Sequence, residues 1–357
     1  MIDFQIFNLE KSPKSENLDP PPMSYDDDVN DAMIKVNNLT TPGVKKLNLV
    51  LHRLTKKYEK TLAVNQLHLQ VQSSECFGLL GVNGAGKTST FKMMMGDEKI
   101  TSGNAWMKGI EVRKQQKDKG YCPQFDALLL DLTAKELMKI FSFIRGIPRK
   151  EISGLIDKLS YELGFKSEID KKAKNLSGGN KRKLSTAVAL IGDPAVIFLD
   201  EPSSGTDQMA KRNLWNVINN LRAAGKTVIL TTHSMDEAES LCTRLAIMVA
   251  GEFKCLGSVQ HLKNKFVKGF VLTVQMNKES DQSAMNDVKT KISQCFPTAL
   301  LKQNFMKLLT FHIADENLKW SQIFSTMTQL KCRLAISDFA ASQTSMNEVF
   351  LFFGKNV

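Results

Sequence analysis

Residues 81–90, GVNGAGKTST, limit the folds open to this chain more than any other stretch. Gly81 to Thr88 fits the pattern G-x-x-x-x-G-K-[ST], in which glycines let successive backbone N–H groups point into one concavity and hold phosphate groups. The apolar run CFGLL before it is typical of a strand buried on both faces, and TSTFKMMMGD after it is typical of a helix. The N-terminus of that helix adds a positive dipole end. The stretch therefore predicts a strand, a phosphate-binding loop and a helix.

Length and composition set broad limits. The 357 residues are enough for about two domains. No segment approaches the ~20 apolar residues that cross a bilayer, and the N-terminus lacks the basic and apolar regions of a secretory signal. The six cysteines are scattered, with no pair at C-x-x-C spacing, which favours a reducing compartment and argues against a zinc site or a disulfide framework.

The net charge of +11 is distributed unevenly. Residues 1–30 carry seven acids and two lysines, so their net charge is −5 and that of the remainder is +16. The basic cluster, residues 166–183, holds seven Lys or Arg against two acids. Such a cluster is compatible with nucleic acid, an anionic membrane face or a phosphorylated ligand, and equally with a solvated charged surface.

The first 44 residues differ from the rest in composition. They contain half of the ten prolines and the acidic run Asp26-Asp27-Asp28, without sustained periodicity. We expect residues 1–44 to form a mostly disordered linker.

Residues 45–265 alternate between strand and helix patterns. NLVLHRLTKKY and LAVNQLHLQV alternate in polarity as half-buried strands do, and AVIFLD (195–200) and TVILTTH (227–233) are typical of buried strands. A helix, MAKRNLWNVINNLRAAG, separates the last two, and the part from about 126 to 190 is mostly helical in pattern. This order predicts a parallel sheet flanked by helices, with a helical subdomain added to it.

Residues 266–357 form a second region with the order β-α-β-β-α-β, which is the ferredoxin-like pattern. A last helix, TSMNEVFLFFG, is expected after it, with Thr344 as its N-cap. The predicted fold class is an α/β P-loop NTPase core with a helical subdomain, followed by a small ferredoxin-like α+β domain.

Two acids follow the buried run at 195–200. Asp200 and Glu201 stand at the carboxyl end of this strand, where α/β sheets bind ligands. With the phosphate loop they predict a nucleotide site, in which Lys87 reaches the β- and γ-phosphates and the Thr88 hydroxyl and Asp200 hold Mg²⁺. Glu201 would polarise an attacking water. Taken alone, the two acids also suit a cap on the turn before Pro202.

Other positions carry weaker signals. Ser177 is a good N-cap in LSGGN (176–180), and the glycines after it leave N–H groups free for an anion, although a plain loop-to-helix transition has the same pattern. His233 ends a strand and is suited to a γ-phosphate or a water, or to a structural role. Gln124 is suited to Mg²⁺ or water and Tyr58 to an adenine, while each also fits an ordinary loop or strand surface.

The chain order of these elements is specific: Tyr58, GVNGAGKT, Gln124, LSGGN, VIFLDE, SSGTD (203–207) and His233. Over about residues 47–265 it resembles the nucleotide-binding domain of an ATP-binding cassette (ABC) protein, because LSGG before the strand that ends in Asp-Glu separates this family from other P-loop ATPases. GYCPQFDAL, SGGNKRKLSTAVALIGDPAVIFLDEP, LCTRLAIMV and CLGSVQHLKNKF resemble subfamily A of the ABC transporters, the lipid exporters. The ferredoxin-like region and SQTSMNEVFLFF resemble the cytosolic regulatory domain of that subfamily, and DDDVNDAM resembles the linker before its second cassette.

The resemblance implies the C-terminal cassette and regulatory domain of a full-length transporter. In that family two cassettes pack head to tail, with ATP between the phosphate loop of one and the LSGG element of the other. The implied partners are a second cassette and transmembrane domains, which place the chain at the cytosolic face of a membrane, and no nucleic acid is implied. The implied catalytic residues are Glu201 as general base, His233 as γ-phosphate sensor and Gln124 as link to the membrane domain; the implied Mg²⁺ ligands are Thr88, Gln124 and Asp200; the implied nucleotide-binding residues are Tyr58, Gly81, Asn83, Gly84, Ala85, Gly86, Lys87, Thr88, Ser89, Ser177, Gly178 and Gly179.

Three positions depart from the common family pattern. Asn180 stands in place of a frequent Gln, as in other subfamily A second cassettes; Ser203 stands in place of Thr, and Thr206 in place of Leu or Met. Because no catalytic position is missing, we expect this cassette to bind ATP and Mg²⁺ and to hydrolyse ATP. Two other function classes stay open: a soluble cassette ATPase that acts on nucleic acid through the basic cluster, and a non-hydrolysing module that binds ATP and only gates a partner.

Overall fold

The structure is a computed structural model that describes residues 26–353, except 116, 267–268, 278–281, 306, 316–317, 344–345, 347–348 and 351–352. The chain divides into two units at the step from Val259 to Gln260, and each unit is described by itself. None of the described helices is both long and apolar enough to span a bilayer.

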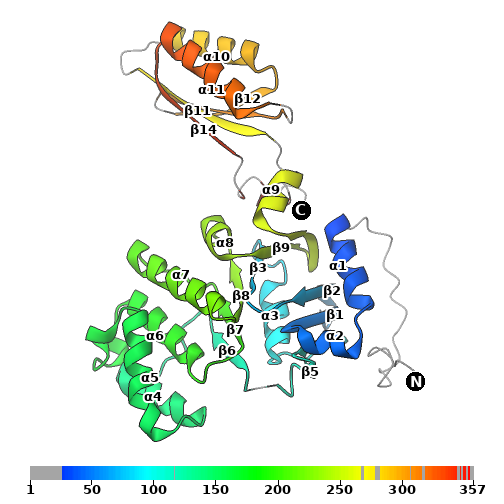
Figure 1. Cartoon of the computed structure of the whole chain (residues 1–357), viewed down its shortest axis with the longest axis vertical. Helices are drawn as coiled ribbons and strands as arrows, with labels where there is room; N and C mark the ends of the chain where they lie inside the picture. The colour runs from blue at the N-terminus through cyan, green and yellow to red at the C-terminus, as the bar shows by residue number, and fades with distance from the viewer. Residues whose placement is uncertain are drawn as a thin grey trace. The chain divides into compact units, whose positions relative to one another are not determined.

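A six-stranded sheet in the order β10-β9-β3-β8-β7-β6 forms the centre of the first unit (Figure 1). Its strands pair in parallel except at β10, which is antiparallel to β9. Every residue of β3, β7 and β8 is buried, as their continuous apolar sequences predict for strands covered on both faces. The strands are β3 (Cys76–Gly81), β6 (Lys119–Cys122), β7 (Val196–Asp200), β8 (Thr227–Thr232), β9 (Arg244–Val249) and β10 (Glu252–Gly257).

A second, antiparallel sheet has the order β2-β1-β4-β5. The two polarity-alternating segments form its first two strands, and bulges interrupt their register. Helix α3 (Lys87–Met95) lies between the two sheets in Figure 1, and its residues Phe91, Met93, Met94 and Met95 belong to a core shared by both. The strands are β1 (Leu49–Tyr58), β2 (Thr61–Val71), β4 (Ser102–Met107) and β5 (Ile110–Glu111).

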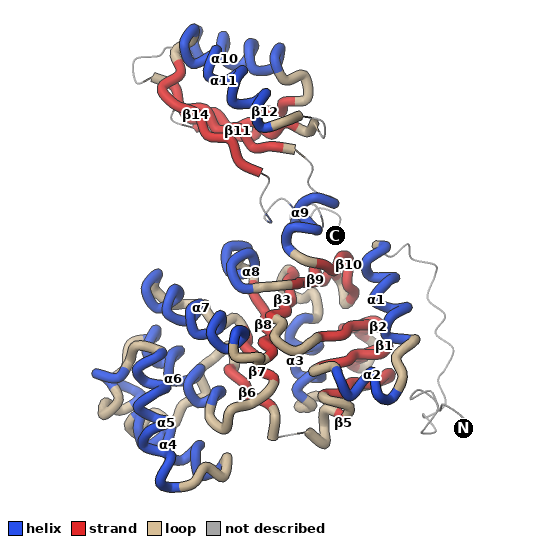
Figure 2. Tube along the Cα trace, viewed as in Figure 1, coloured by secondary structure: helices blue, strands red, loops and turns tan. Residues whose placement is uncertain are grey.

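Helices between β6 and β7 form the subdomain predicted for residues 126–190 (Figure 2). A capping box at Thr133 and Glu136 starts α4, whose apolar face packs on α5 and α6, while α6 also packs on β6. Helix α7 covers β8. The subdomain helices are α4 (Ala134–Ile144), α5 (Arg149–Glu162), the short 3₁₀ helices η2 (Lys166–Glu168) and η3 (Ala173–Asn175), and α6 (Gly178–Leu190). Outside the subdomain, α7 (Gln208–Ala223) follows β7, α8 (Met235–Leu241) follows β8, and α9 (Val259–Phe266) begins at the division between the two units.

The prediction of a disordered linker through residue 44 is wrong for its last part, and residues 1–25 lie outside the described residues. Helix α1 (Asp27–Asn37) and helix α2 (Thr41–Lys46) occupy this part and contact the strands. Val36 and Val44 are buried in a small cluster with Val50 of β1. The acidic run Asp26-Asp27-Asp28, which favoured disorder in the sequence, instead begins helix α1, because the Asp26 carboxylate caps it by accepting a hydrogen bond from the Asp28 amide.

The second unit has the predicted ferredoxin-like order. Its antiparallel sheet runs β12-β13-β11-β14, with α10 and α11 as the two crossover helices. Its core is a separate cluster that includes Leu272, Phe311 and Ile323. Most of the expected last helix, with Thr344, lies outside the described residues. The elements are β11 (Phe270–Met276), α10 (Gln282–Cys295), β12 (Ala299–Phe305), β13 (Leu308–Ile313), α11 (Trp320–Arg333) and β14 (Ile336–Gln343).

Candidate functional site

The predicted phosphate loop joins β3 to α3. Gly84 and Gly86 have φ values of 82° and 98°, which side-chain-bearing residues rarely adopt. A Cβ on Gly86 would collide with the Ala63 carbonyl oxygen, and one on Gly81 with that of Met248. Space and backbone conformation therefore both require glycine at Gly86, and space requires it at Gly81. The loop residues Asn83 and Gly84 are exposed, and Ala85 is buried.

Lys87 folds back over this loop. Its ammonium donates to the carbonyl oxygens of Gly81, at 2.6 Å, and Val82, at 3.0 Å. The side chain is buried, and burial lowers the pKa of Lys87, while the charges of Glu201 and Asp200 oppose this effect. The loop thus holds a desolvated cation next to two acids.

Asp200 is the buried acid at the end of β7. The Thr231 hydroxyl, on neighbouring β8, donates to its Oδ1 at 2.5 Å. Burial raises the pKa of Asp200 and the charge of Glu201 raises it further, while the Thr231 hydrogen bond lowers it. Asp200 is therefore an acid whose charged form is costly unless a cation lies beside it.

Glu201 is held at both carboxylate oxygens by the other predicted catalytic residues. The Gln124 side-chain amide donates to Oε2 at 3.1 Å, and the His233 Nδ1 lies 3.3 Å from Oε1. Gln124 follows β6 and His233 follows β8, so these side chains meet because β6, β7 and β8 are parallel and end at one edge of the sheet. Gly81, at the end of β3, lies at the same edge.

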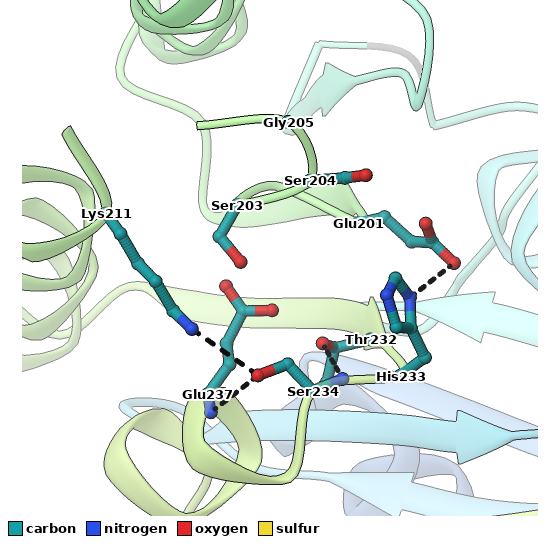
Figure 3. A pocket seen from close by; sticks show the side chains of 9 residues that line it. All are labelled: Glu201, Ser203, Ser204, Gly205, Lys211, Thr232, His233, Ser234 and Glu237. Atoms are coloured by element: carbon teal, nitrogen blue, oxygen red, sulfur yellow. Dashed lines mark hydrogen bonds and ion pairs between the residues drawn. The ribbon is translucent and has the colours of Figure 1, made fainter. Parts of the chain in front are cut away.

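Beside this edge lies a cavity of about 210 Å³ (Figure 3). Glu237 of α8 points into it and is only 1% exposed, and its Oε1 has no hydrogen-bond partner among the described residues. Lys211 and the Glu237 amide both donate to the Ser234 hydroxyl, each at 3.4 Å. The lining residues are Glu201, Ser203, Ser204, Gly205, Lys211, Thr232, His233, Ser234 and Glu237.

The LSGGN element begins α6 as predicted. The Ser177 hydroxyl accepts from the Asn180 amide at 3.2 Å, and Ser177 and Gly178 are exposed. Within the described residues, no hydrogen bond or ion pair joins Ser177, Gly178 or Gly179 to the Lys87 loop. The structure thus assembles the phosphate loop, the acids, Gln124 and His233 at one edge, and it leaves the second helix start apart from them.

The segment 203–207 forms a turn between β7 and α7. The Thr206 hydroxyl donates to the Ser203 carbonyl at 2.7 Å, and the Asp207 carboxylate caps α7 by accepting from the Ala210 amide at 2.8 Å. The unusual Thr206 therefore closes this turn with its own side chain.

The remaining predicted positions lie beside the phosphate loop. Thr88 is exposed on the first turn of α3. Tyr58, at the end of β1, is 40% exposed, and its hydroxyl donates to the Ser89 hydroxyl at 3.4 Å. The Lys56 ammonium lies 4.6 Å from the centre of the Tyr58 ring.

Several members of the basic cluster are paired with acids or buried in this structure. Lys166, Lys171 and Lys174 pair with the acids Asp157, Glu168 and Asp131, and Arg182 is buried. Sequence reasoning counted Arg182 only as a member of this cluster. It also missed Thr231 and Glu237, although a polar residue inside the apolar run TVILTT and an acid four residues after His233 were visible signals.

Two family models match the chain. The ABC transporter model covers residues 64–204, and the model of the ABCA1-like C-terminal R1 regulatory domain covers residues 267–343. The second match coincides with most of the ferredoxin-like unit.

Curated relatives match most of this chain. Phospholipid-transporting ATPase ABCA3 of Homo sapiens is 43% identical over 340 residues, covering 93% of this chain and 20% of the relative. Human ATP-binding cassette sub-family A member 2 is 46% identical, covering 92% and 13%, and human retinal-specific phospholipid-transporting ATPase ABCA4 is 41% identical, covering 96% and 15%. The chain thus spans a fifth or less of the length of these relatives.

Solved structures resemble the first unit. An ATP-binding subunit of an ABC transporter superposes with a TM-score of 0.58 at 24% identity, covering 61% of this chain and 92% of that chain. A dimeric ATP-binding cassette in a post-hydrolysis state with ADP and Pi gives a TM-score of 0.55 at 21% identity, covering 59% and 98%. At this identity the likeness establishes the fold, which is that of an ABC ATPase.

Proposed function

We propose that this chain is a member of subfamily A of the ABC transporters and that it binds and hydrolyses ATP to power the movement of lipids across a membrane. The observation that carries the proposal is the meeting of Gln124, Glu201 and His233 beside the Lys87 loop, at one edge of a parallel sheet. These residues lie far apart in sequence, and their side chains suit phosphate binding and activation of water.

ATP phosphates would lie in the loop between β3 and α3. Lys87 would exchange its two carbonyl partners for β- and γ-phosphate oxygens. Since burial lowers the pKa of Lys87, an anion in the loop would relieve the cost of its desolvated charge. Tyr58 lies beside Ser89 on the rim of the loop and would stack on the adenine.

The residues at this edge also fit Mg²⁺. Thr88, Asp200 and Gln124 offer hydroxyl, carboxylate and amide oxygens, the donors that a hard divalent cation prefers. Burial raises the pKa of Asp200, so a cation beside it would stabilise the charged carboxylate. When bound, Mg²⁺ would neutralise phosphate charge.

Glu201 would accept the proton of the attacking water. Gln124 and His233 fix the orientation of its carboxylate from two sides, so the base is positioned before substrate arrives. His233 is exposed at the same edge, where its ring can also contact the γ-phosphate.

A second cassette is the proposed partner. The start of α6, with exposed Ser177 and Gly178, suits an anion and has no contact with the chain's own phosphate loop among the described residues. It would complete the site of an opposing cassette, as that cassette would complete this one. The proposed setting is the cytosolic face of a membrane, next to transmembrane domains. Lipids are proposed as cargo because two relatives are named phospholipid-transporting ATPases.

The test separates binding from turnover. Calorimetric titration with ATP and Mg²⁺ should show binding by the chain and by Glu201→Gln, and none by Lys87→Ala. The rate of ATP hydrolysis per molecule is then measured against protein concentration. A rate that rises with concentration and vanishes in Glu201→Gln supports a homodimer with working sites.

A negligible rate at every concentration, with clear ATP binding, means that the start of α6 needs a different cassette opposite it. Absence of ATP binding overturns the proposal. Turnover by Glu201→Gln equal to that of the parent chain refutes the assigned base.

A further inference from the structure

Arg182 is a buried cation beside the proposed catalytic edge. It lies in the second turn of α6, and its side chain is 5% exposed. Its guanidinium donates to two separate loops of the site, and every one of its nitrogens has an acceptor. A planar fork of five donors is the side chain that can serve two loops at once.

The first loop follows β6. One terminal nitrogen of Arg182 donates to the carbonyl oxygens of Pro123 and Gln124, the latter at 3.3 Å, and to Asp126 Oδ1 at 3.3 Å. Arg182 therefore fixes the backbone from which the Gln124 side chain reaches Glu201.

The second loop follows β7. The other terminal nitrogen donates to the carbonyl oxygens of Asp200, at 2.5 Å, and Glu201, at 3.1 Å, and Nε donates to that of Pro202 at 2.9 Å. The same guanidinium thus holds the backbone on both sides of the Gln124 to Glu201 hydrogen bond.

Glu201 needs such support because its backbone is unusual. Its φ is +46°, a conformation that costs free energy for a residue with a side chain and persists where the surroundings fix it. The Glu201 amide donates to Thr231, at 3.1 Å to the carbonyl and 3.0 Å to the hydroxyl. Its carbonyl is held by Arg182. The conformation of the proposed base is therefore fixed from β8 on one side and from α6 on the other.

We propose that Arg182 is a positioning residue that sets Gln124 and Glu201 in register and ties both to α6. The importance of this register for turnover rests on the proposed function, since Glu201 is there the base. Because α6 begins at the proposed anion site Ser177, the same helix that meets an opposing nucleotide carries the cation that orders this chain's own base.

A role in stability alone would give a different result. If Arg182 only stabilised the fold, its replacement would lower the melting temperature, and a change in one loop would not alter the mobility of the other. A positioning role requires that loosening one loop also loosens the other, and that this link disappears when the guanidinium does. The test therefore measures both loops in the full chain without nucleotide.

Two probes report on the loops. Hydrogen exchange at the amides of Glu201 and Ser204, which are hydrogen-bonded, reports on the loop after β7. Alkylation of buried Cys122 by iodoacetamide, mapped by peptide mass spectrometry, reports on the loop after β6. Arg182→Lys keeps the positive charge and loses the fork, so we expect both rates to rise roughly 10- to 100-fold, from the size of charged hydrogen bonds.

The matched control is Lys183→Ala, the next residue of the helix, whose ammonium contacts the Gly164 carbonyl oxygen at 3.0 Å. It should leave both rates within twofold of the parent. Asp126→Asn replaces a charged acceptor of the first loop by a neutral amide and so weakens one contact of that loop only. It should therefore raise exchange at Glu201 in the parent and leave it unchanged in Arg182→Lys. Because Asp126→Asn alters a partly exposed residue, it keeps the test usable if Arg182→Lys folds poorly.

The inference is overturned if Arg182→Lys leaves both rates at parental values, or if only one loop loosens. It is also overturned if Asp126→Asn has no effect at Glu201 in the parent. A parent chain that binds no ATP refutes the proposed function and leaves the nucleotide-free measurement of the two loops decisive for Arg182.

Discussion

Replacement of Thr231 by valine tests whether the buried acid of the site is electrostatically costly. The Thr231 hydroxyl donates to Asp200 at 2.5 Å and accepts from the Glu201 amide at 3.0 Å. A hydrogen bond to a charged group contributes about 1.5–3 kcal/mol. The Glu201 amide keeps the Thr231 carbonyl at 3.1 Å, so its loss is minor. The buried methyl group of valine returns about 1 kcal/mol, which leaves a net loss of about 0.5–2 kcal/mol.

For a domain of this size, 1 kcal/mol shifts the melting temperature by about 2–4 °C, so Thr231→Val should melt about 1–8 °C lower near neutral pH. The sign of the pH dependence follows from Asp200. Its hydrogen bond with Thr231 favours the charged carboxylate and lowers the pKa of Asp200, whose net pKa is raised from 3.8 by burial. The deficit of Thr231→Val should therefore be largest above the Asp200 pKa and shrink as the pH falls through it.

Thr232→Val is the matched control. Thr232 is also buried in β8, but its hydroxyl accepts from the Ser234 amide at 3.0 Å and no acid contacts it in the described structure. Thermal melts of both variants from about pH 4 to about pH 8 should show a pH-dependent deficit for Thr231→Val alone. Equal deficits at every pH would refute the argument that Thr231 stabilises a charged Asp200.

Three further results are expected. Asp200→Asn should melt at a higher temperature than the parent chain near neutral pH and at the same temperature in acid, because a carboxyl group with a raised pKa costs stability as the pH rises above 3.8. The variant should also lose the stabilisation that Mg²⁺ and ATP give the parent, and a melting temperature below that of the parent at neutral pH would contradict the argument. Gly86→Ala should lower the free energy of unfolding by about 2 kcal/mol or more and abolish ATP binding, since Gly86 has a φ of 98° and the new Cβ would collide with the Ala63 carbonyl oxygen. The control Gly178→Ala, with no atom within 4 Å of its Cβ, should melt at the temperature of the parent. Calorimetry of the full chain should resolve two transitions, because the cores are separate, and Leu309→Ala should cost about 2–5 kcal/mol in one of them only; a shift of both would indicate a single cooperative unit.

The central strands could be predicted because burial on both faces leaves a simple trace in sequence. The apolar runs that end at Gly81, Asp200 and His233 correspond to β3, β7 and β8, and parallel pairing then places their carboxyl ends together. The meeting of Glu201 with Gln124 and His233 follows from that topology. Their distances do not, since they depend on loop conformations that no periodicity encodes.

Helix α1 could not be predicted from its own residues. The segment is rich in acids and prolines and poor in hydrophobic residues, and such a composition, considered without its neighbours, is typical of disorder. Its stability comes from contact with β2 and β10 and from burial of Val36 against Val50, which lies beyond any local window. Here the acids act through their position: Asp26 caps the helix, and Asp27 and Asp28 lie in its first turn, where the positive end of the helix dipole stabilises negative charge.

Arg182 shows the same limit at the site. In sequence it is one of seven basic residues in the basic cluster. In the structure it is buried by the loops after β6 and β7, and its role depends on carbonyl groups, whose residue types carry no signal. A cation that recognises backbone can only be found once the backbone is placed.

The adjacent acids Asp200 and Glu201 illustrate how one φ angle assigns function. In a regular strand, neighbouring side chains point to opposite faces, so only one acid could face a given side of β8. Asp200 contacts Thr231 of β8, and Glu201 contacts His233, the first residue after β8. The left-handed backbone of Glu201, with φ of +46°, ends this alternation directly after β7. In the proposed function the buried acid Asp200 holds a cation and Glu201 accepts a proton from water, and this difference lies in the backbone rather than in the residue types.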